Sequence, residues 1–203
     1  SIEGGFVLAK TREDRLRLRA MRAHGWVRHL PSDVQEAHSK AHPDIDSRFL
    51  FIDVGFNMRP LDLCATIGRA QLDRLSGSNE ARRANHAAMT QRLHNTCGIF
   101  IPQPPPDAKV AWLALPLLLP SSVDLGPFQE ALEGVGVQTR PIISGNFLRQ
   151  PMMKTWGLEV EDFASFTGAE TVHAHGIYIG LHGVLWSPTY CDSLSSKIIG
   201  LLS

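Results

Sequence analysis

The order of apolar and polar positions at the start of the chain predicts a turn, a strand and a helix. Gly4-Gly5 predicts the turn, and the apolar run over residues 6–9 predicts a short buried strand. Thr11 is suited to cap a helix, because its hydroxyl can accept from a free backbone N–H three residues on. Apolar residues then recur at helical spacing up to Gly25, which is a residue type typical of the position just past a helix end.

The middle of the chain is predicted to hold a surface loop and a long helix. Residues 31–50 are polar and contain two prolines, a composition typical of a loop. Pro60 suits the first position of a helix, where its missing N–H is not needed. An apolar stripe follows, and Ser76-Gly77-Ser78 is expected to interrupt the helix before it resumes at Glu80 and continues to about His94.

Beyond Gly98 the pattern changes to short elements. Four prolines between residues 102 and 106 predict a stiff connector, and Pro116 places the following strand at a sheet edge or bulge. The remaining expected elements are a strand over 112–119, a helix over 127–133 ending at Gly134, a strand over 137–140, a loop through Asn146, a helix over 169–175 and a strand over 177–181. Strands that alternate with helices indicate an α/β or α+β class.

Composition restricts the classes of partner. The chain has 203 residues, of which 43% are hydrophobic, and Lys+Arg and Asp+Glu balance at 20 each, so no basic field would attract nucleic acid. The three cysteines form no CxxC pair, which argues against a disulfide framework and favours a reducing cytoplasm. The most apolar stretch, residues 110–119, is too short to span a bilayer, so no membrane role is expected.

Common catalytic motifs are missing from the sequence. His38 and His42 have the i, i+4 spacing of zinc ligands, but the glutamate of HExxH is absent, so no metal is expected. Ser144-Gly145 has Ile142 where a GxSxG elbow needs glycine, which argues against a serine hydrolase. No GxGxxG or Walker loop occurs either.

Three polar clusters, over residues 22–28, 55–60 and 140–147, each place an arginine beside a Gly or Pro turn. A guanidinium in such a place can bind phosphate through two parallel hydrogen bonds. Asn57 also lies just ahead of the expected helix start, where backbone N–H groups and the helix dipole favour an anion. The residues alone leave two interpretations open: anion recognition, or surface salt bridges with Asn57 as a simple cap.

The motifs EGG at 3–5, RAHGW at 22–26 and GFNMRPLDLCATIGRAQLDRL at 55–75 resemble, in this order, the DegT/DnrJ/StrS-type sugar aminotransferase family. WLALPLLL at 112–119 and IYIGLH at 177–182 extend the resemblance over nearly the whole chain. It implies the α/β fold of the C-terminal part of a fold-type I PLP-dependent transferase. Residues 1–58 would be the end of the large domain, and residues 59–203 the small domain with the long linking helix.

Two motifs, RAHGWVRHLP at 22–31 and TRPIISGNF at 139–147, are most similar to the sugar 3-dehydratase branch of this family. The resemblance implies a cytoplasmic homodimer with shared active sites. It would use pyridoxal or pyridoxamine 5′-phosphate to remove the 3-hydroxyl of a nucleotide-linked 4-keto-6-deoxy sugar in lipopolysaccharide synthesis. Two alternatives stay open: a nucleotide-sugar aminotransferase, or an inactive truncated dimerisation module.

The resemblance also implies roles for single residues. The catalytic Lys or His would lie just upstream of Ser1, which leaves His24 as the candidate catalytic residue within the chain. Asn57 would bind the cofactor phosphate of the partner subunit, although Phe56 replaces the tyrosine that often precedes it. The expected substrate-binding residues are Arg28, Arg59, Arg140, Ser144 and Asn146.

Overall fold

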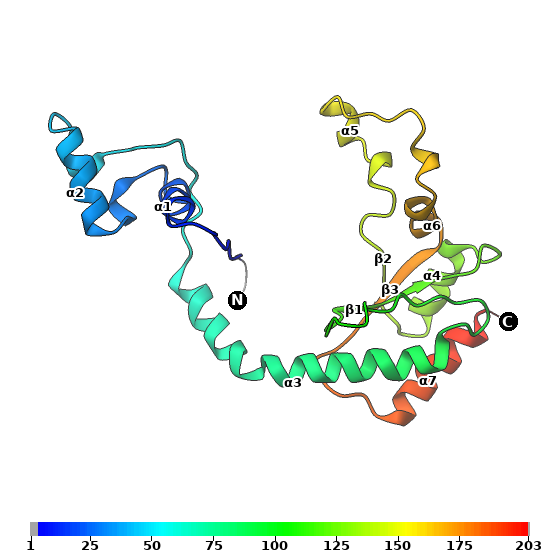
Figure 1. Cartoon of the computed structure of the whole chain (residues 1–203). Coiled ribbons are helices and arrows are strands. Elements are labelled where there is room, and N and C mark those ends of the chain that lie inside the picture. Colours follow the sequence, from blue (N-terminus) through cyan, green and yellow to red (C-terminus); the bar gives the residue numbers. More distant parts are fainter. Residues whose placement is uncertain (1–3, 203) are drawn as a thin grey trace. The chain divides into compact units, whose positions relative to one another are not determined.

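The computed structural model describes residues 4–202 (Figure 1). The chain divides into two compact units, the first ending at Asp73 and the second beginning at Arg74. The division falls inside the long helix α3 (Asp62–Leu93), so one helix contributes to both units. The expected boundary of the large-domain remnant at residue 58 stays a prediction.

The first unit holds short helices joined by hydrogen-bonded loops. Thr11 caps α1 as predicted, accepting from the Asp14 N–H at 3.0 Å. The strand predicted over residues 6–9 is wrong: these residues are exposed, and no strand pairs with them among the described residues. The elements of this unit before α3 are α1 (Arg12–Met21), η1 (Val27–His29), α2 (Ser32–Ala41) and η2 (Ser47–Phe49).

The loop predicted over residues 31–50 is also wrong in part, because α2 occupies its first half. Pro31 precedes the helix with a φ of −58°, a value that is already helical for proline. The Gln35 side chain turns back to donate to the Leu30 carbonyl at 2.7 Å, which ties the first turns of α2 to the preceding loop. The polar composition of this segment suggested a loop, although Pro31 and the Gln35 side chain both support the start of a helix.

Helix α3 runs without a break through Ser76-Gly77-Ser78, so the predicted interruption is wrong. Glycine costs a helix about 1 kcal/mol relative to alanine, and a long helix can absorb that cost. The small residues also serve packing, since a Cβ added to Gly183 would lie 3.0 Å from the Ser78 side chain. The helix begins at Asp62 rather than at Pro60.

The second unit is built on a three-stranded antiparallel sheet of order β1-β3-β2 (Figure 1). Pro116 lies on β1 at one end of this order, which confirms the predicted edge position. The elements after α3 are β1 (Ala114–Leu118), α4 (Leu125–Gly134), β2 (Thr139–Pro141), η3 (Phe147–Arg149), α5 (Met152–Thr155), η4 (Phe163–Ser165), α6 (Thr167–His175), β3 (Gly176–Gly180) and α7 (Pro188–Gly200).

One face of the sheet forms the core of the second unit. Leu115 and Leu117 on β1 lie opposite Ile179 and Ile177 on β3, and all four are buried. Helices α3, α4 and α7 contribute the other buried side of the same cluster: Met89, Leu93, Phe128, Leu132, Leu194 and Ile198. Because strand residues alternate between faces, the side chains of Pro116, Tyr178 and Arg140 are left on the opposite, uncovered face.

Candidate functional site

In the first unit, the segments over 22–27 and 50–58 lie antiparallel and are joined by backbone hydrogen bonds. His24 N–H donates to the Phe56 carbonyl at 2.9 Å, and the amides of Met58 and Ile52 donate to the carbonyls of Arg22 and Gly25 at 2.8 and 2.9 Å. Two motifs separated by about thirty positions in the sequence therefore form one local structure.

Two glycines permit this close approach. A Cβ on Gly25 would lie 1.7 Å from the Asp53 carbonyl oxygen, and a Cβ on Gly55 would lie 2.2 Å from the Gly25 nitrogen. Gly25 also has a φ of +78°, which favours glycine. Its predicted position just past the end of α1 is wrong, since α1 already ends at Met21. Gly25 serves the contact between the segments.

The paired segments bring His24 and Asn57 into one region. The backbone of Ala23 bridges to that of Asn57, and His24 adopts a positive φ of 64° with an exposed ring. Asn57 is exposed, and its Oδ1 accepts from Arg59 Nε at 3.3 Å. Within residues 4–202 nothing accepts from the Asn57 amide nitrogen, so that donor is available to a ligand.

Arginine charges gather around His29 in the same unit. Burial lowers the pKa of His29 below its ordinary value, and the positive charges of Arg59, Arg22, Arg28 and Arg19 lower this pKa further. No salt bridge neutralises these four arginines within the described part of the chain. Uncompensated guanidinium groups of this kind favour a phosphate or another anion.

Arg28 also packs against an aromatic cluster. Its guanidinium lies 5.2 Å from the centre of the Trp26 ring, and that ring stacks on Phe49 and Phe51. The Trp26 indole donates to the Arg48 carbonyl at 2.8 Å, which fixes its orientation. Arg28 borders a polar pocket of about 440 Å³ that Ser32, Gln35, Ser39 and Arg48 also line.

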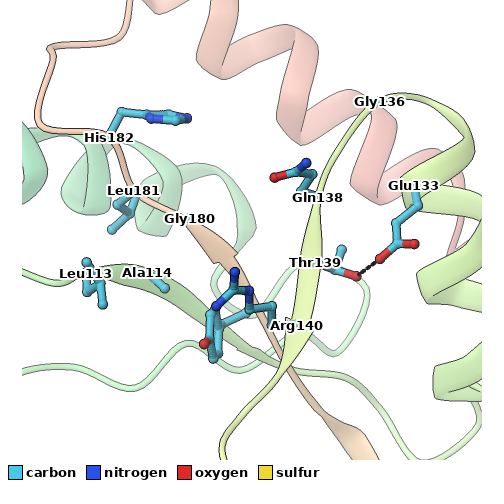
Figure 2. Close-up of a pocket in the computed structure, with 11 residues that line it drawn as sticks. Leu113, Ala114, Glu133, Gly136, Gln138, Thr139, Arg140, Gly180, Leu181 and His182 are labelled. Carbon is cyan, nitrogen blue, oxygen red and sulfur yellow. Dashed lines mark hydrogen bonds between the residues drawn. The ribbon is translucent and has the colours of Figure 1, made fainter. Parts of the chain in front are cut away.

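In the second unit, Arg140 borders a groove of about 870 Å³ on the uncovered face of the sheet (Figure 2). It lies on β2 directly opposite Tyr178 of β3. The groove is mixed in character, with Glu133, Gln138 and His182 as further polar residues. Glu133 accepts a hydrogen bond from Thr139 at 2.8 Å, so this carboxylate is held at the groove wall while Arg140 has no ion-pair partner among the described residues.

Ser144 and Asn146 lie on the loop that follows β2, but their environments differ. Ser144 is half-buried, and its hydroxyl makes no hydrogen bond within residues 4–202. Asn146 is 1% exposed, and both ends of its amide are bonded within the chain. Of the expected substrate residues, Arg28 and Arg59 thus lie in the first unit, and Arg140 and this loop lie in the second.

Other features of the described chain bear on the expected partners. Residues 4–202 hold no cluster of three or more His, Cys, Asp or Glu side chains that could bind a metal ion. In the same residues no helix is long and apolar enough to cross a membrane. His38 and His42, the pair with zinc-like spacing, lie at the end of α2 and just beyond it.

Sequence reasoning missed several residues at these sites. Arg19 was not among the predicted site residues, although its charge lowers the pKa of His29. Arg22 is the first residue of the RAHGW motif and received no predicted role, although its charge also lowers this pKa. Glu170 and Arg149, which hold the loop of Asn146, carry no sequence signal because they lie 21 positions apart.

The mixed α/β fold aligns with about 46% of the length of the chains of fold-type I PLP enzymes. The model of the DegT/DnrJ/EryC1/StrS aminotransferase family matches residues 1–187. The chain belongs to this family.

The relatives include several 3-dehydratases. The GDP-4-keto-6-deoxy-D-mannose 3-dehydratase of Yersinia pseudotuberculosis is 30% identical over 91% of this chain and 47% of its own. The structure of the Escherichia coli enzyme with bound hydrated PLP has 25% identity and a TM-score of 0.74 over 89% of this chain and 46% of its own. A mutant GDP-4-keto-6-deoxymannose-3-dehydratase with bound GDP-perosamine aligns over the same shares, with 25% identity and a TM-score of 0.75. The chain thus spans about half the length of the curated relatives it matches.

Proposed function

We propose that the protein carrying this chain is a B6-dependent enzyme that removes the 3-hydroxyl of a nucleotide-linked 4-keto-6-deoxy sugar. The observation that carries the proposal is the hydrogen-bonded pairing of the segments over 22–27 and 50–58. It places His24 and Asn57 together, beside uncompensated arginine charge. Similarity to two GDP-4-keto-6-deoxy-D-mannose 3-dehydratases supports the choice of reaction.

The residues present fit the phosphate of pyridoxal or pyridoxamine 5′-phosphate. Asn57 offers a free amide N–H, and Arg59 lies beside it with its Nε bonded to the Asn57 oxygen. This bond occupies the Asn57 oxygen and leaves its nitrogen as the donor for a ligand. When bound, the cofactor would supply the electron sink that makes loss of the C3 hydroxyl feasible. In the proposed homodimer, Asn57 would serve the site of the partner subunit.

The other candidate residues would bind the substrate and handle its protons. Arg28 and Arg59 would bind the diphosphate of the sugar nucleotide, since both carry charge that no described carboxylate neutralises. His24 would hold or move a proton near the sugar, because its ring is exposed and an imidazole can accept and donate protons. Arg140 and Ser144 remain the proposed substrate contacts of the second unit, considered by itself.

Product analysis tests the proposal against transamination. The protein is incubated with GDP-4-keto-6-deoxy-D-mannose, pyridoxal phosphate and glutamate, and the products are identified by mass spectrometry and NMR. A product that lacks the oxygen at C3 supports dehydration. A product with an amino group at C4 would establish aminotransferase activity instead. No turnover together with no retention of pyridoxal phosphate would refute both and favour an inactive dimerisation module.

A further inference from the structure

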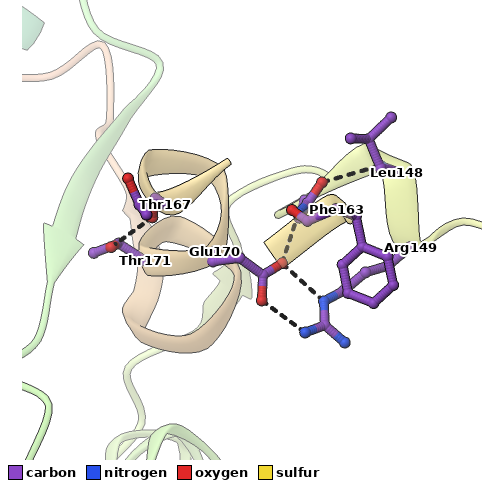
Figure 3. Close-up of polar contacts among 7 residues, drawn as sticks. Leu148, Arg149, Phe163, Thr167, Glu170 and Thr171 are labelled. Atoms are coloured by element: carbon purple, nitrogen blue, oxygen red, sulfur yellow. Dashed lines mark hydrogen bonds and ion pairs between the residues drawn. The ribbon is translucent and has the colours of Figure 1, made fainter. Parts of the chain in front are cut away.

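The loop that carries Ser144 is held by a side chain from outside its motif. Asn146 Nδ2 donates to Glu170 Oε1 at 2.6 Å and to the Phe163 carbonyl at 3.1 Å. Its Oδ1 accepts from the Leu148 N–H at 3.1 Å. Figure 3 shows Glu170 reaching from α6 toward this loop. A buried amide with three bonds inside the chain serves the shape of the loop and has no donor left for a substrate.

Glu170 also binds the end of the same loop through Arg149. Its two carboxylate oxygens accept from Arg149 Nε at 2.9 Å and Nη2 at 2.6 Å, a paired geometry (Figure 3). The Arg149 guanidinium in turn lies 4.6 Å from the centre of the Phe163 ring. Hydrogen bonds from Arg149 and Asn146 lower the pKa of Glu170 to about 2, so the carboxylate is charged at neutral pH.

A glycine brings the same loop against α6. A Cβ on Gly145 would lie 2.4 Å from Nδ1 of His173, one turn along the helix from Glu170. The loop is therefore fixed on both sides of Gly145: Asn146 is bonded to Glu170, and Ser144 precedes the contact. The Ser144 hydroxyl is the polar group that this arrangement leaves without a described partner.

We infer that Glu170 is a positioning residue for substrate binding: by bonding Asn146 and Arg149 it fixes the loop over 142–149 and presents the Ser144 hydroxyl to the sugar nucleotide. This inference rests on the proposed function, because it requires the loop to face the substrate. It also assigns Asn146 to the support of the loop in place of the substrate contact expected from the resemblance. Glu170 itself does not touch the substrate.

The experiment compares Glu170→Gln, Glu170→Ala and Asn146→Ala in the protein that carries this chain. Glutamine keeps an acceptor for Asn146 but loses the charge that binds Arg149, whereas alanine loses both contacts. With GDP-4-keto-6-deoxy-D-mannose we expect KM to rise about tenfold in Glu170→Ala, equivalent to about 1.4 kcal/mol, and less in Glu170→Gln, with a smaller change in kcat. Because the two residues act on one loop, Asn146→Ala should add little to Glu170→Ala in the double variant.

Asp192→Asn provides the matched control. Asp192 also accepts from an arginine, Arg92, at 2.7 Å, but this ion pair joins α7 to α3 and does not contact the loop. Its loss should leave KM unchanged. If Glu170 had only a structural role, Glu170→Ala would lower thermal stability without changing KM. An unchanged KM in Glu170→Ala would therefore overturn the inference. Turnover by the wild-type protein would leave the proposed function intact in that case.

Hydrogen exchange separates failure of the inference from failure of the proposed function. If the wild-type protein does not turn over the substrate, the proposed function fails and the substrate part of the inference fails with it. Faster exchange of the Gly145 and Leu148 amides in Glu170→Ala would then still support the role of Glu170 in fixing the loop. Exchange at the wild-type rate would overturn that role as well.

Discussion

Replacement of Gly25 by alanine tests the pairing that places His24 beside Asn57. A left-handed backbone costs alanine about 1–2 kcal/mol, and Gly25 has a φ of +78°. The added Cβ would also lie 1.7 Å from the Asp53 oxygen, so the two segments must separate. Separation breaks the bonds of Ile52 to Gly25 and of His24 to Phe56, each worth about 1 kcal/mol net. We therefore expect a total cost of about 3–4 kcal/mol.

Gly136→Ala separates the effect of backbone strain from the effect of the close approach. Gly136 has a similar φ of +84°, but nothing lies within 4 Å of a Cβ added there, so only the backbone cost of about 1–2 kcal/mol applies. The free energy of unfolding of each unit is measured by hydrogen exchange at its most protected amides. The reasoning is refuted if the two substitutions cost the same, because the contact between Gly25 and Asp53 would then contribute nothing.

Three further predictions concern other contacts. Asn57→Ala should weaken retention of pyridoxal phosphate about 10- to 100-fold without changing the circular dichroism spectrum, since one hydrogen bond to a charged phosphate is lost at an exposed residue; equilibrium dialysis measures this. Asn85→Ala should lower the free energy of unfolding by about 2–3 kcal/mol in urea, because Asn85 is buried and binds the carbonyls of residues 182 and 184 and the Trp186 N–H. Glu170→Gln should lower the melting temperature at pH 7 but not near pH 2. The pKa of Glu170 is lowered to about 2 in the folded state, from about 4.3 in the unfolded state, so its carboxylate stabilises the fold above the unfolded pKa. This stabilisation is lost as the pH falls toward 2.

Features encoded by neighbouring residues could be predicted from the sequence. The Thr11 cap, the end of α4 at Gly134 and the edge position of Pro116 each depend on one residue type and its immediate backbone. Helix α7 was missed although its signal is of the same kind: Ser187 caps it and Pro188 occupies its first turn. Local chemistry thus explains most of the correct element assignments.

Features that depend on distant residues could not be predicted in this way. Helix α3 continues through Gly77, and the adjacent Ser78 packs closely against Gly183, a distant residue in the sequence. The strand expected over residues 6–9 failed because the apolar pattern contains no information on whether a partner strand is present. The burial of Asn146 depends on Glu170, 24 positions away, so the motif suggested a polar residue at the site but not its role.

The two motifs that resemble the dehydratases differ in the contacts that fix their conformation. The segments over 22–27 and 50–58 are joined by backbone hydrogen bonds and by contacts that need glycine at 25 and 55, so the motif residues themselves fix their geometry. The loop over 142–149 depends on Glu170 of α6 and on Phe163 of η4, neither of which belongs to the TRPIISGNF motif. A substitution on α6 can therefore change the shape of this loop while the motif stays intact. We expect specificity for the sugar to vary with the residues at positions 163 and 170, and retention of the cofactor to be insensitive to them.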